Sequence, residues 1–300
     1  MIHLKDYQRT AVNELKAKLL SMLSLQSERQ KLVFKAPTGS GKTVMSAALL
    51  DELKEEMDKL YKEIAFIWIA PNKLHYQSCK SLRNLFSEKH TLEPIFFDEA
   101  DCNEGLKSGQ VLFLNWESIA KENAVIIRDN EQNRNLSQLV ESTKRVGKIV
   151  FVIIDEEHYH AGVNAKRSEE ALQLIKPKIE FRVSATPTTS GCPLIEVPRE
   201  VVIEEGMIKK SVVLNPFLKS DDSSTLTINQ QLLEKALSQR DHLAKAYYEF
   251  NVNPLLLIQL PNDKSDTLSA EEKSLLNELE SYLQHLVNYT FNRLKINELY

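Results

Sequence analysis

A stretch rich in glycine, residues 36–43 with the sequence APTGSGKT, contains the residue types that could hold a phosphate group. Glycines let successive backbone N–H groups curl around an anion, and the N-terminus of a following helix adds a positive dipole. Lys42 would then reach the β- and γ-phosphates of a nucleotide, and the Thr43 hydroxyl would bind magnesium. The residues expected around the nucleotide are Thr38, Gly39, Ser40, Gly41, Lys42 and Thr43.

An ordinary glycine turn that caps a helix is the alternative interpretation of this stretch. The flanking sequence decides between the two, because the apolar run KLVF precedes the loop and the amphipathic run TVMSAALLDELKEEMDKLYK follows it. A strand, a loop and a helix in this order are typical of the Walker A phosphate loop. The sequence departs from that pattern at one position, where Ala36 replaces the first glycine.

Two acidic residues, Asp155 and Glu156, follow the apolar run KIVFVII at residues 148–154. Side chains at the carboxyl end of such a strand emerge at the edge of the sheet where ligands bind. We expect Asp155 to hold magnesium and Glu156 to orient and deprotonate an attacking water. The acids alone could be a solvated strand end, but together with the phosphate loop they predict a site for a nucleotide and Mg²⁺.

Short apolar runs that alternate with helical segments must position these side chains. Nearly continuous apolar strands separated by helices predict an α/β fold with a parallel sheet covered on both faces. The expected strands are residues 31–34, 64–70, 94–97, 111–114, 148–154 and 181–185.

The remaining segments are less regular. Residues 117–147 are polar and predict a surface excursion, and residues 196–216 predict two short extended runs. A long helix is expected near residues 227–249, a buried strand at 254–260, and a further helix that starts at a capping box, Ser269 with Glu272. We therefore expect a first domain at residues 1–210, and at 211–300 a linker with an incomplete second domain.

Composition narrows the functional class. The 300 residues contain 38 Lys and Arg against 42 Asp and Glu, which gives a net charge of −4. This charge argues against a protein that coats nucleic acid by bulk attraction, and it still permits a local basic groove. No segment approaches the roughly 20 apolar residues that span a bilayer. Three widely separated cysteines are typical of reduced thiols. We expect a cytoplasmic protein without a membrane partner.

The sequence DEEH at residues 155–158, followed by SATP at 184–187, resembles motifs II and III of the superfamily-two DExH (DEAD/DEAH-box) helicases and translocases. This resemblance implies a RecA-like P-loop fold with ATP and Mg²⁺ as cofactors. It also implies that His158, Ser184 and Thr186 couple the nucleotide state to nucleic-acid binding.

Two further stretches extend the resemblance. The sequence LKDYQ at residues 4–8 resembles the Q motif, which implies that Gln8 reads the adenine edge of ATP. The sequence APNK at residues 70–73 resembles motif Ia, which implies that Asn72 and Lys73 contact a nucleic-acid backbone.

Within this superfamily the chain is most similar to the ATPase part of type III restriction enzyme Res subunits, over about residues 1–265. The stretches VLFLNWESI, VPREVVIEEGMIKKSVVLNP and NPLLLIQLPND carry this similarity. It implies two RecA-like lobes that clamp ATP, duplex DNA contacted through its backbone, a separate nuclease domain, and a methyltransferase partner that recognises the target sequence.

The chain departs from this family after the strand expected at residues 254–260. We find no counterpart of motifs V and VI or of the nuclease, so we expect a truncated product that binds ATP and hydrolyses it slowly. Two alternatives stay open. One is a stand-alone DNA or RNA helicase or repair translocase, and the other is a catalytically silent nucleotide-binding module.

Overall fold

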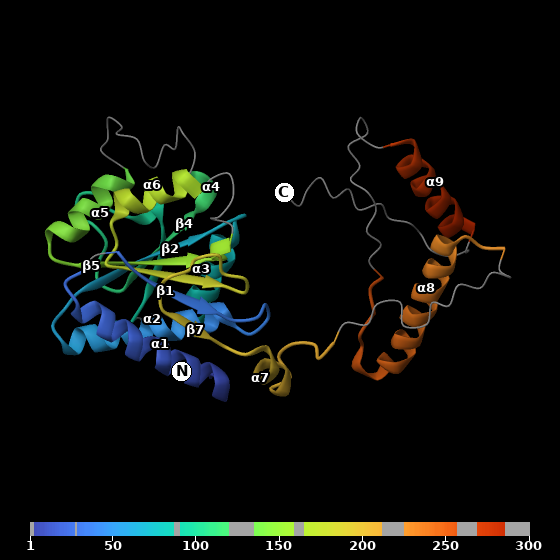
Figure 1. The fold of residues 1–300 in the computed structure, drawn as a ribbon, viewed down its shortest axis with the longest axis horizontal. Coiled ribbons are helices and arrows are strands. Elements are labelled where there is room, and N and C mark those ends of the chain that lie inside the picture. The colour runs from blue at the N-terminus through green and yellow to red at the C-terminus, as the bar shows by residue number, and fades with distance from the viewer. Residues whose placement is uncertain are drawn as a thin grey trace. The chain divides into compact units, whose positions relative to one another are not determined.

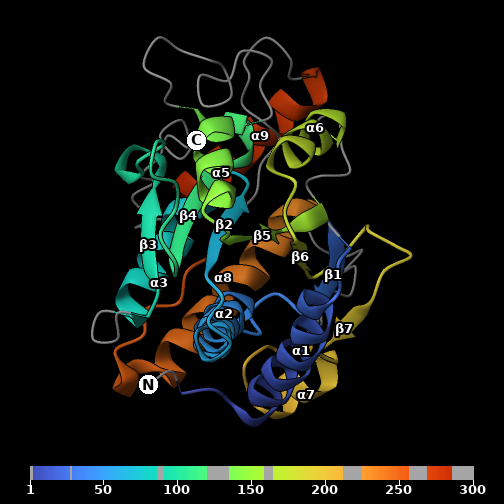
Figure 2. The ribbon, with the colours of Figure 1, turned by 90° about the vertical axis from the view of Figure 1, so that its left-hand side faces the viewer.

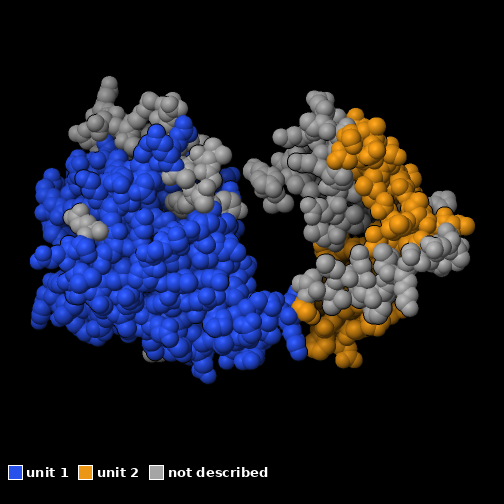
Figure 3. Space-filling view, viewed as in Figure 1, with its two compact units in different colours: residues 1–210 blue, residues 211–300 orange. Residues whose placement is uncertain are grey.

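The structure is a computed structural model of the chain (Figure 1). It describes residues 3–27, 29–86, 91–119, 135–158, 165–211, 225–256 and 269–285. The chain divides into two compact units, Met1–Lys210 and Ser211–Tyr300 (Figure 3). Each unit is described by itself.

The first unit is built around a seven-stranded sheet in the order β3-β4-β2-β5-β6-β1-β7, and every pair of neighbouring strands is parallel. All seven residues of β2 are buried, as expected for a strand whose two faces are both covered. The six strands predicted from the sequence are confirmed. The strands are β1 (Gln30–Lys35), β2 (Ile64–Ala70), β3 (Glu93–Phe96), β4 (Gln110–Asn115), β5 (Ile149–Asp155), β6 (Ile179–Ser184) and β7 (Leu194–Glu196).

Helices cover both faces of this sheet, which confirms the predicted RecA-like α/β architecture (Figures 1 and 2). One face carries α1 (Asp6–Ser24), α2 (Lys42–Lys59) and α3 (Leu74–Leu85). The other face carries α4 (Trp116–Ile119), α5 (Leu136–Arg145) and α6 (Ala165–Ile175). A 3-10 turn, Phe97–Glu99, follows β3.

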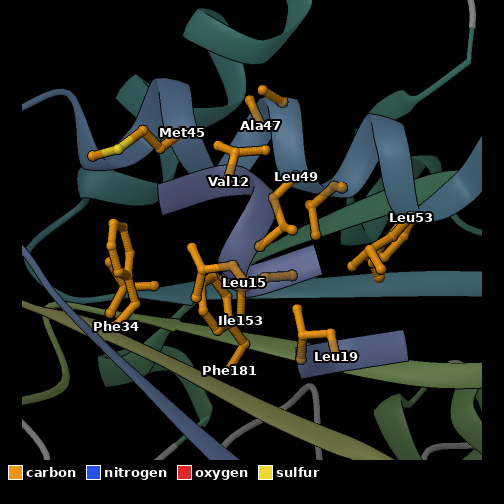
Figure 4. Packing of buried hydrophobic residues seen from close by; sticks show 14 of the residues in the cluster. Val12, Leu15, Leu19, Phe34, Met45, Ala47, Leu49, Leu53, Ile153 and Phe181 are labelled. Carbon is orange, nitrogen blue, oxygen red and sulfur yellow. The ribbon is translucent and has the colours of Figure 1, made fainter. Parts of the chain in front are cut away.

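Apolar side chains from α1 and α2 interlock over the first of these faces (Figure 4). Val12, Leu15 and Leu19 recur at helical spacing along α1, and all three are fully buried. They pack with Leu49 of α2 and Phe34 of β1 in one continuous core. Phe34 stands two residues before the first residue of the phosphate loop. This core therefore fixes the end of β1, from which the loop departs.

The prediction of a surface excursion over residues 117–147 is wrong where the structure describes them. Residues 136–145 form helix α5, and its buried side chains Leu136, Leu139 and Val140 pack against the sheet. Asn135 caps this helix by accepting a hydrogen bond from the Gln138 N–H at 2.8 Å. The prediction failed because one face of this helix is buried while its overall composition is polar. Residues 120–134 lie outside the described part.

The first of the two extended runs predicted over residues 196–216 is also wrong. Strand β7 (Leu194–Glu196) ends at the start of this stretch, and α7 (Arg199–Glu204) begins three residues later. Pro198 occupies the N-cap position in an extended conformation, and Val202 of α7 is fully buried. The β-branched residues favoured a strand, but packing against the core overrides that propensity. Residues 212–216 lie outside the described part.

The second unit contains α8 (Ile228–Ala246), a 3-10 turn at Tyr248–Phe250 and α9 (Ala270–His285), which confirms both predicted helices. The capping box is present, since the Glu272 N–H donates to Ser269 Oγ and the Ser269 N–H donates to Glu272. Residues 254–256 of the predicted strand are irregular, and residues 257–260 lie outside the described part. Among the helices that the structure describes, none has the length and apolarity needed to cross a bilayer.

Candidate nucleotide site

The sheet brings the carboxyl ends of β1, β5 and β6 to one edge. In the strand register Lys35 at the end of β1 pairs with Ser184 at the end of β6, and Val183 of β6 pairs with Asp155 of β5. The loop after β1, the acids after β5 and the Ser-Ala-Thr segment after β6 therefore start side by side. Parallel α/β sheets bind ligands at this edge.

The loop after β1 needs its two glycines. Gly39 and Gly41 both have φ of +84°, a region that side chains with a Cβ rarely adopt. A Cβ at Gly41 would lie 2.5 Å from Gln8 Nε2, and one at Gly39 would lie 3.0 Å from Ile208 Cγ2. Helix α2 begins directly after Gly41, so its free N–H groups point into the loop. Thr38 is exposed at the tip of the loop, and Thr43 lies in the first turn of α2.

Lys42 and the acids meet in the structure although more than a hundred residues separate them in the sequence. Lys42 Nζ lies 3.7 Å from Glu156 Oε1, and the Lys42 residue is only 8% exposed. Asp155 is 7% exposed and accepts a hydrogen bond from Trp68 Nε1 at 3.3 Å. Glu156 has φ of +50°, an uncommon conformation for a non-glycine residue that is often found at functional sites.

Burial, reinforced by the neighbouring Glu156 carboxylate, raises the pKa of Asp155 to about 6. The Trp68 hydrogen bond and the Lys42 charge oppose this shift. A buried carboxyl that gives up its proton near neutral pH is well suited to exchange that proton for a cation. The ligand-free protein therefore holds Asp155 in an energetically unfavourable ionised state at pH 7.

We expect Asp155→Asn to stabilise the ligand-free protein. Because the folded-state pKa of about 6 exceeds the ordinary 3.8, the stability conferred by protonation is complete below about pH 4 and is lost as the pH rises through 6. Asparagine does not ionise, so the free energy of unfolding in urea should rise by roughly 1 to 3 kcal/mol at pH 7.5, and by less at pH 4.5.

Asp58→Asn is the matched control for this experiment. Asp58 is an exposed residue near the end of α2 that pairs with Lys54, so its replacement should change stability by less than about 0.5 kcal/mol at either pH. Equal stability of wild type and Asp155→Asn at pH 7.5 would contradict the claim that the ionised Asp155 destabilises the ligand-free protein.

His158 connects the acids to the Ser-Ala-Thr segment. His158 Nδ1 lies 3.0 Å from Ser184 Oγ and 3.4 Å from Glu156 Oε2. Ser184 Oγ also accepts a hydrogen bond from the Thr186 N–H at 3.1 Å. The structure thus brings together all three residues that the sequence predicted for coupling, and one of them, His158, contacts Glu156.

Gln8 lies against the phosphate loop and is 4% exposed. Its Nε2 donates to the Ser40 carbonyl at 2.9 Å, and its Oε1 accepts from the Lys5 N–H at 2.9 Å. Tyr7, which the sequence analysis missed, donates its hydroxyl to the same Ser40 carbonyl at 2.7 Å. Both side chains position the loop, and adenine recognition by Gln8 stays a prediction.

Asn72 and Lys73 lie just beyond the carboxyl end of β2, at the same edge of the sheet. Their φ angles are +50° and +61°, so two consecutive non-glycine residues adopt the left-handed conformation. Glu117, which follows the neighbouring strand β4, accepts the Asn72 N–H at 2.9 Å. Sequence reasoning missed Glu117, because only the pairing of β2 with β4 places it beside this turn.

Comparison with known proteins places this arrangement in a family. A family profile described as "Type III restriction enzyme, res subunit" matches residues 1–189, which is more than half of the chain. The chain belongs to this family. Its first unit is accordingly a superfamily-two helicase-like ATPase module with a nucleotide-binding site, which confirms the resemblance drawn from DEEH and SATP. A search of curated proteins found no match.

Partial matches among solved structures include a restriction-modification enzyme and helicases. A nuclease-deletion mutant of the Type ISP restriction-modification enzyme LlaGI, in complex with a DNA substrate mimic, is 14% identical with a TM-score of 0.44; the match covers 95% of this chain and 24% of that one. The UvsW helicase from bacteriophage T4 is 15% identical, with a TM-score of 0.37 and coverage of 65% and 61%. S. cerevisiae Dbp5 bound to RNA and ADP BeF3 is 14% identical, with a TM-score of 0.37 and coverage of 65% and 50%.

Proposed function

We propose that the first unit binds ATP with Mg²⁺ and hydrolyses it, as the ATPase lobe of a type III restriction DNA translocase. The observation that carries this proposal is the 3.7 Å approach of Lys42 Nζ to Glu156, beside the buried Asp155. A lysine from a phosphate loop and two carboxylates from a neighbouring strand end are the parts that phosphoryl transfer requires.

The residues present fit a nucleotide and a magnesium ion. The Ser40 hydroxyl is buried without a hydrogen-bond partner among the described residues, and both loop glycines hold the backbone at φ of +84°, which lets successive N–H groups turn toward an anion. The Thr43 hydroxyl and the Asp155 carboxylate are the oxygen ligands that Mg²⁺ prefers. In the described part of the chain no group of three or more His, Cys, Asp or Glu could hold a metal ion alone. Magnesium commonly completes its shell with substrate phosphates and water.

Each residue has a separate role in the proposed reaction. Lys42 and the loop N–H groups would bind the β- and γ-phosphates, while Thr43 and Asp155 would hold a metal ion, which would supply positive charge beside those phosphates. Glu156 accepts a proton from the attacking water, and the contact of its Oε2 with His158 at 3.4 Å orients its carboxylate. Gln8 would read the adenine edge of ATP, and its contact with the Ser40 carbonyl positions the phosphate loop.

Nucleic-acid binding is assigned to the same edge of the sheet. Asn72 and Lys73 would contact a duplex DNA backbone, and the His158–Ser184 contact would report the state of the nucleotide to that surface. A DNA-methylating partner subunit would recognise the target sequence.

Among the described residues no arginine forms a hydrogen bond or ion pair with Lys42, Asp155 or Glu156. An arginine at the γ-phosphate is worth roughly a thousand-fold or more in turnover. Slow turnover by these 300 residues is part of this proposal.

Mutual effects of ATP and DNA test this function without requiring rapid turnover. We expect a slowly hydrolysed ATP analogue with Mg²⁺ to change the dissociation constant for a short duplex by about fivefold or more, and the duplex to change the affinity for the analogue by the same factor. Duplex affinity should fall steeply between 50 and 200 mM salt if the contacts are to the backbone. Fast DNA-stimulated turnover would refute the inference of slow hydrolysis, and tight ATP binding that is indifferent to DNA would favour a silent nucleotide-binding module.

A further inference from the structure

Glu157, the third residue of DEEH, has no role in the site described so far, yet it is among the most buried charged residues of the chain, at 1% exposed. Its carboxylate accepts hydrogen bonds from the Thr188 N–H at 2.8 Å, the Thr188 hydroxyl at 3.1 Å and the Thr189 N–H at 3.0 Å. The Thr189 hydroxyl also donates to it. One carboxylate thus binds four donors of the loop that follows the Ser-Ala-Thr segment.

The charge of Glu157 is retained in this buried position. Burial alone would raise the pKa of Glu157, but the hydrogen bonds from Thr189 and Thr188 outweigh it and hold the pKa below its ordinary value. Arg182 of β6 adds to this effect, with its Nη1 3.6 Å from Glu157 Oε1. The side chain is therefore a carboxylate at neutral pH, and its four donors are charge-assisted hydrogen bonds, which are stronger than neutral ones.

A row of buried charged side chains, Arg182 and Glu180 of β6 with Arg29 before β1, holds Thr189 in place. Arg182 Nη1 donates to Thr189 Oγ1 at 2.9 Å, and its Nη2 donates to Glu180 at 2.6 Å. Glu180 in turn accepts two hydrogen bonds from Arg29, at 2.7 and 2.9 Å. Because each charge in the row has a partner on a strand or strand end, the row holds Arg182 and the loop residue Thr189 against the sheet.

The loop at residues 185–190 is therefore attached to the acidic motif at two points. His158 contacts Ser184 at the start of the loop, and Glu157 binds Thr188 and Thr189 farther along it. The same loop lines a cavity of about 510 Å³ together with β1 and β7, so close packing does not fix it on every side. A displacement of the acids would reach this loop through Glu157, which follows Glu156 directly in the chain.

We propose that Glu157 is a positioning residue that couples the nucleotide state to the loop at residues 185–190 by holding Thr188 and Thr189. This proposal rests on the proposed function, since it names a second contact through which the ATP site acts on nucleic-acid binding. A purely structural carboxylate would contribute to folding and leave the coupling between the two ligands unchanged. The two roles differ in a measurable quantity, the ratio of DNA dissociation constants without and with the ATP analogue.

The test compares this ratio in wild type, Glu157→Gln and Glu169→Gln, with the slowly hydrolysed ATP analogue, Mg²⁺ and a short duplex as probes. Glutamine keeps the volume of Glu157 but removes its charge and one acceptor oxygen. We expect the ratio to fall from fivefold or more to about one in Glu157→Gln, while the affinity for the analogue alone stays within about twofold of wild type. Glu169→Gln is the control, because Glu169 pairs with Arg29 at the half-exposed outer end of the same charged row.

Thr189→Val provides a second variant if Glu157→Gln does not fold, because it keeps both charges of the Glu157–Arg182 pair and removes one hydroxyl donor. It should lower the ratio in the same direction. Hydrogen exchange gives an independent readout: addition of the analogue should change the protection of the Thr188 and Thr189 amides in wild type and not in Glu157→Gln. A wild-type ratio that persists in both variants overturns the proposal alone, whereas a wild-type chain that does not bind the analogue overturns the proposed function as well.

Discussion

Replacing Lys42 by alanine will weaken ATP binding by about 100-fold or more. Lys42 is the one phosphate-loop side chain that carries a positive charge, and it is buried beside Glu156 at 3.7 Å. A charge-assisted hydrogen bond to phosphate contributes about 1.5 to 3 kcal/mol, and the loss leaves two carboxylates facing the phosphates without a compensating charge. Isothermal titration of the wild type and Lys42→Ala with ATP and Mg²⁺ measures this difference directly.

Lys59→Ala is the matched control, because Lys59 ends the same helix and its exposed side chain pairs with Glu56. Its replacement should leave the dissociation constant for ATP unchanged within about twofold. Equal affinities of wild type and Lys42→Ala would show that the glycine loop does not bind the phosphates.

Replacing Glu156 by glutamine will retain ATP binding and remove most of whatever turnover the chain supports. General-base catalysis contributes about 10² to 10⁴-fold to a rate, and an amide cannot accept the proton of the attacking water. Glutamine has the same length as glutamate and adopts the φ of +50° at this position at no greater energetic cost. The local fold should therefore persist. Single-turnover hydrolysis of labelled ATP detects slow rates and separates chemistry from binding.

Glu56→Gln serves as the control for Glu156→Gln, since Glu56 lies on the surface of α2 and pairs with Lys59. It should hydrolyse ATP at the wild-type rate. If Glu156→Gln and wild type hydrolyse ATP equally fast, the base is another residue and the role assigned to Glu156 is wrong.

The strands and the residues at their carboxyl ends could be predicted because both signals are local. The apolar runs of β2 and β5 identify buried strands, and in a parallel sheet the ends of such strands share one edge. This geometry is sufficient to bring Lys42 near Asp155 and Glu156 without any knowledge of the loops. The role expected of His158 and Ser184 came instead from the resemblance of DEEH and SATP to helicase motifs.

The contacts of Glu157, Tyr7 and Glu117 could not be predicted in the same way. Each depends on how a loop folds back over a strand end, which the pattern of apolar residues does not encode. For example, Glu157 reads as one more acid in a polar run, and only the turn after Ser184 brings the donors of Thr188 and Thr189 to it. Helix α7 was missed for a related reason, because its β-branched residues indicate a strand and its burial decides for a helix.

Magnesium dependence of ATP binding tests most directly whether the phosphate loop and the distant acids form one site. ATP is titrated into wild type and Asp155→Asn, each with Mg²⁺ and with the metal chelated by EDTA. If Asp155 holds the ion that ATP brings, Mg²⁺ should tighten binding to the wild type by about tenfold or more and have little effect on Asp155→Asn. The same tightening in both proteins would contradict a shared site for Lys42, Asp155 and the triphosphate.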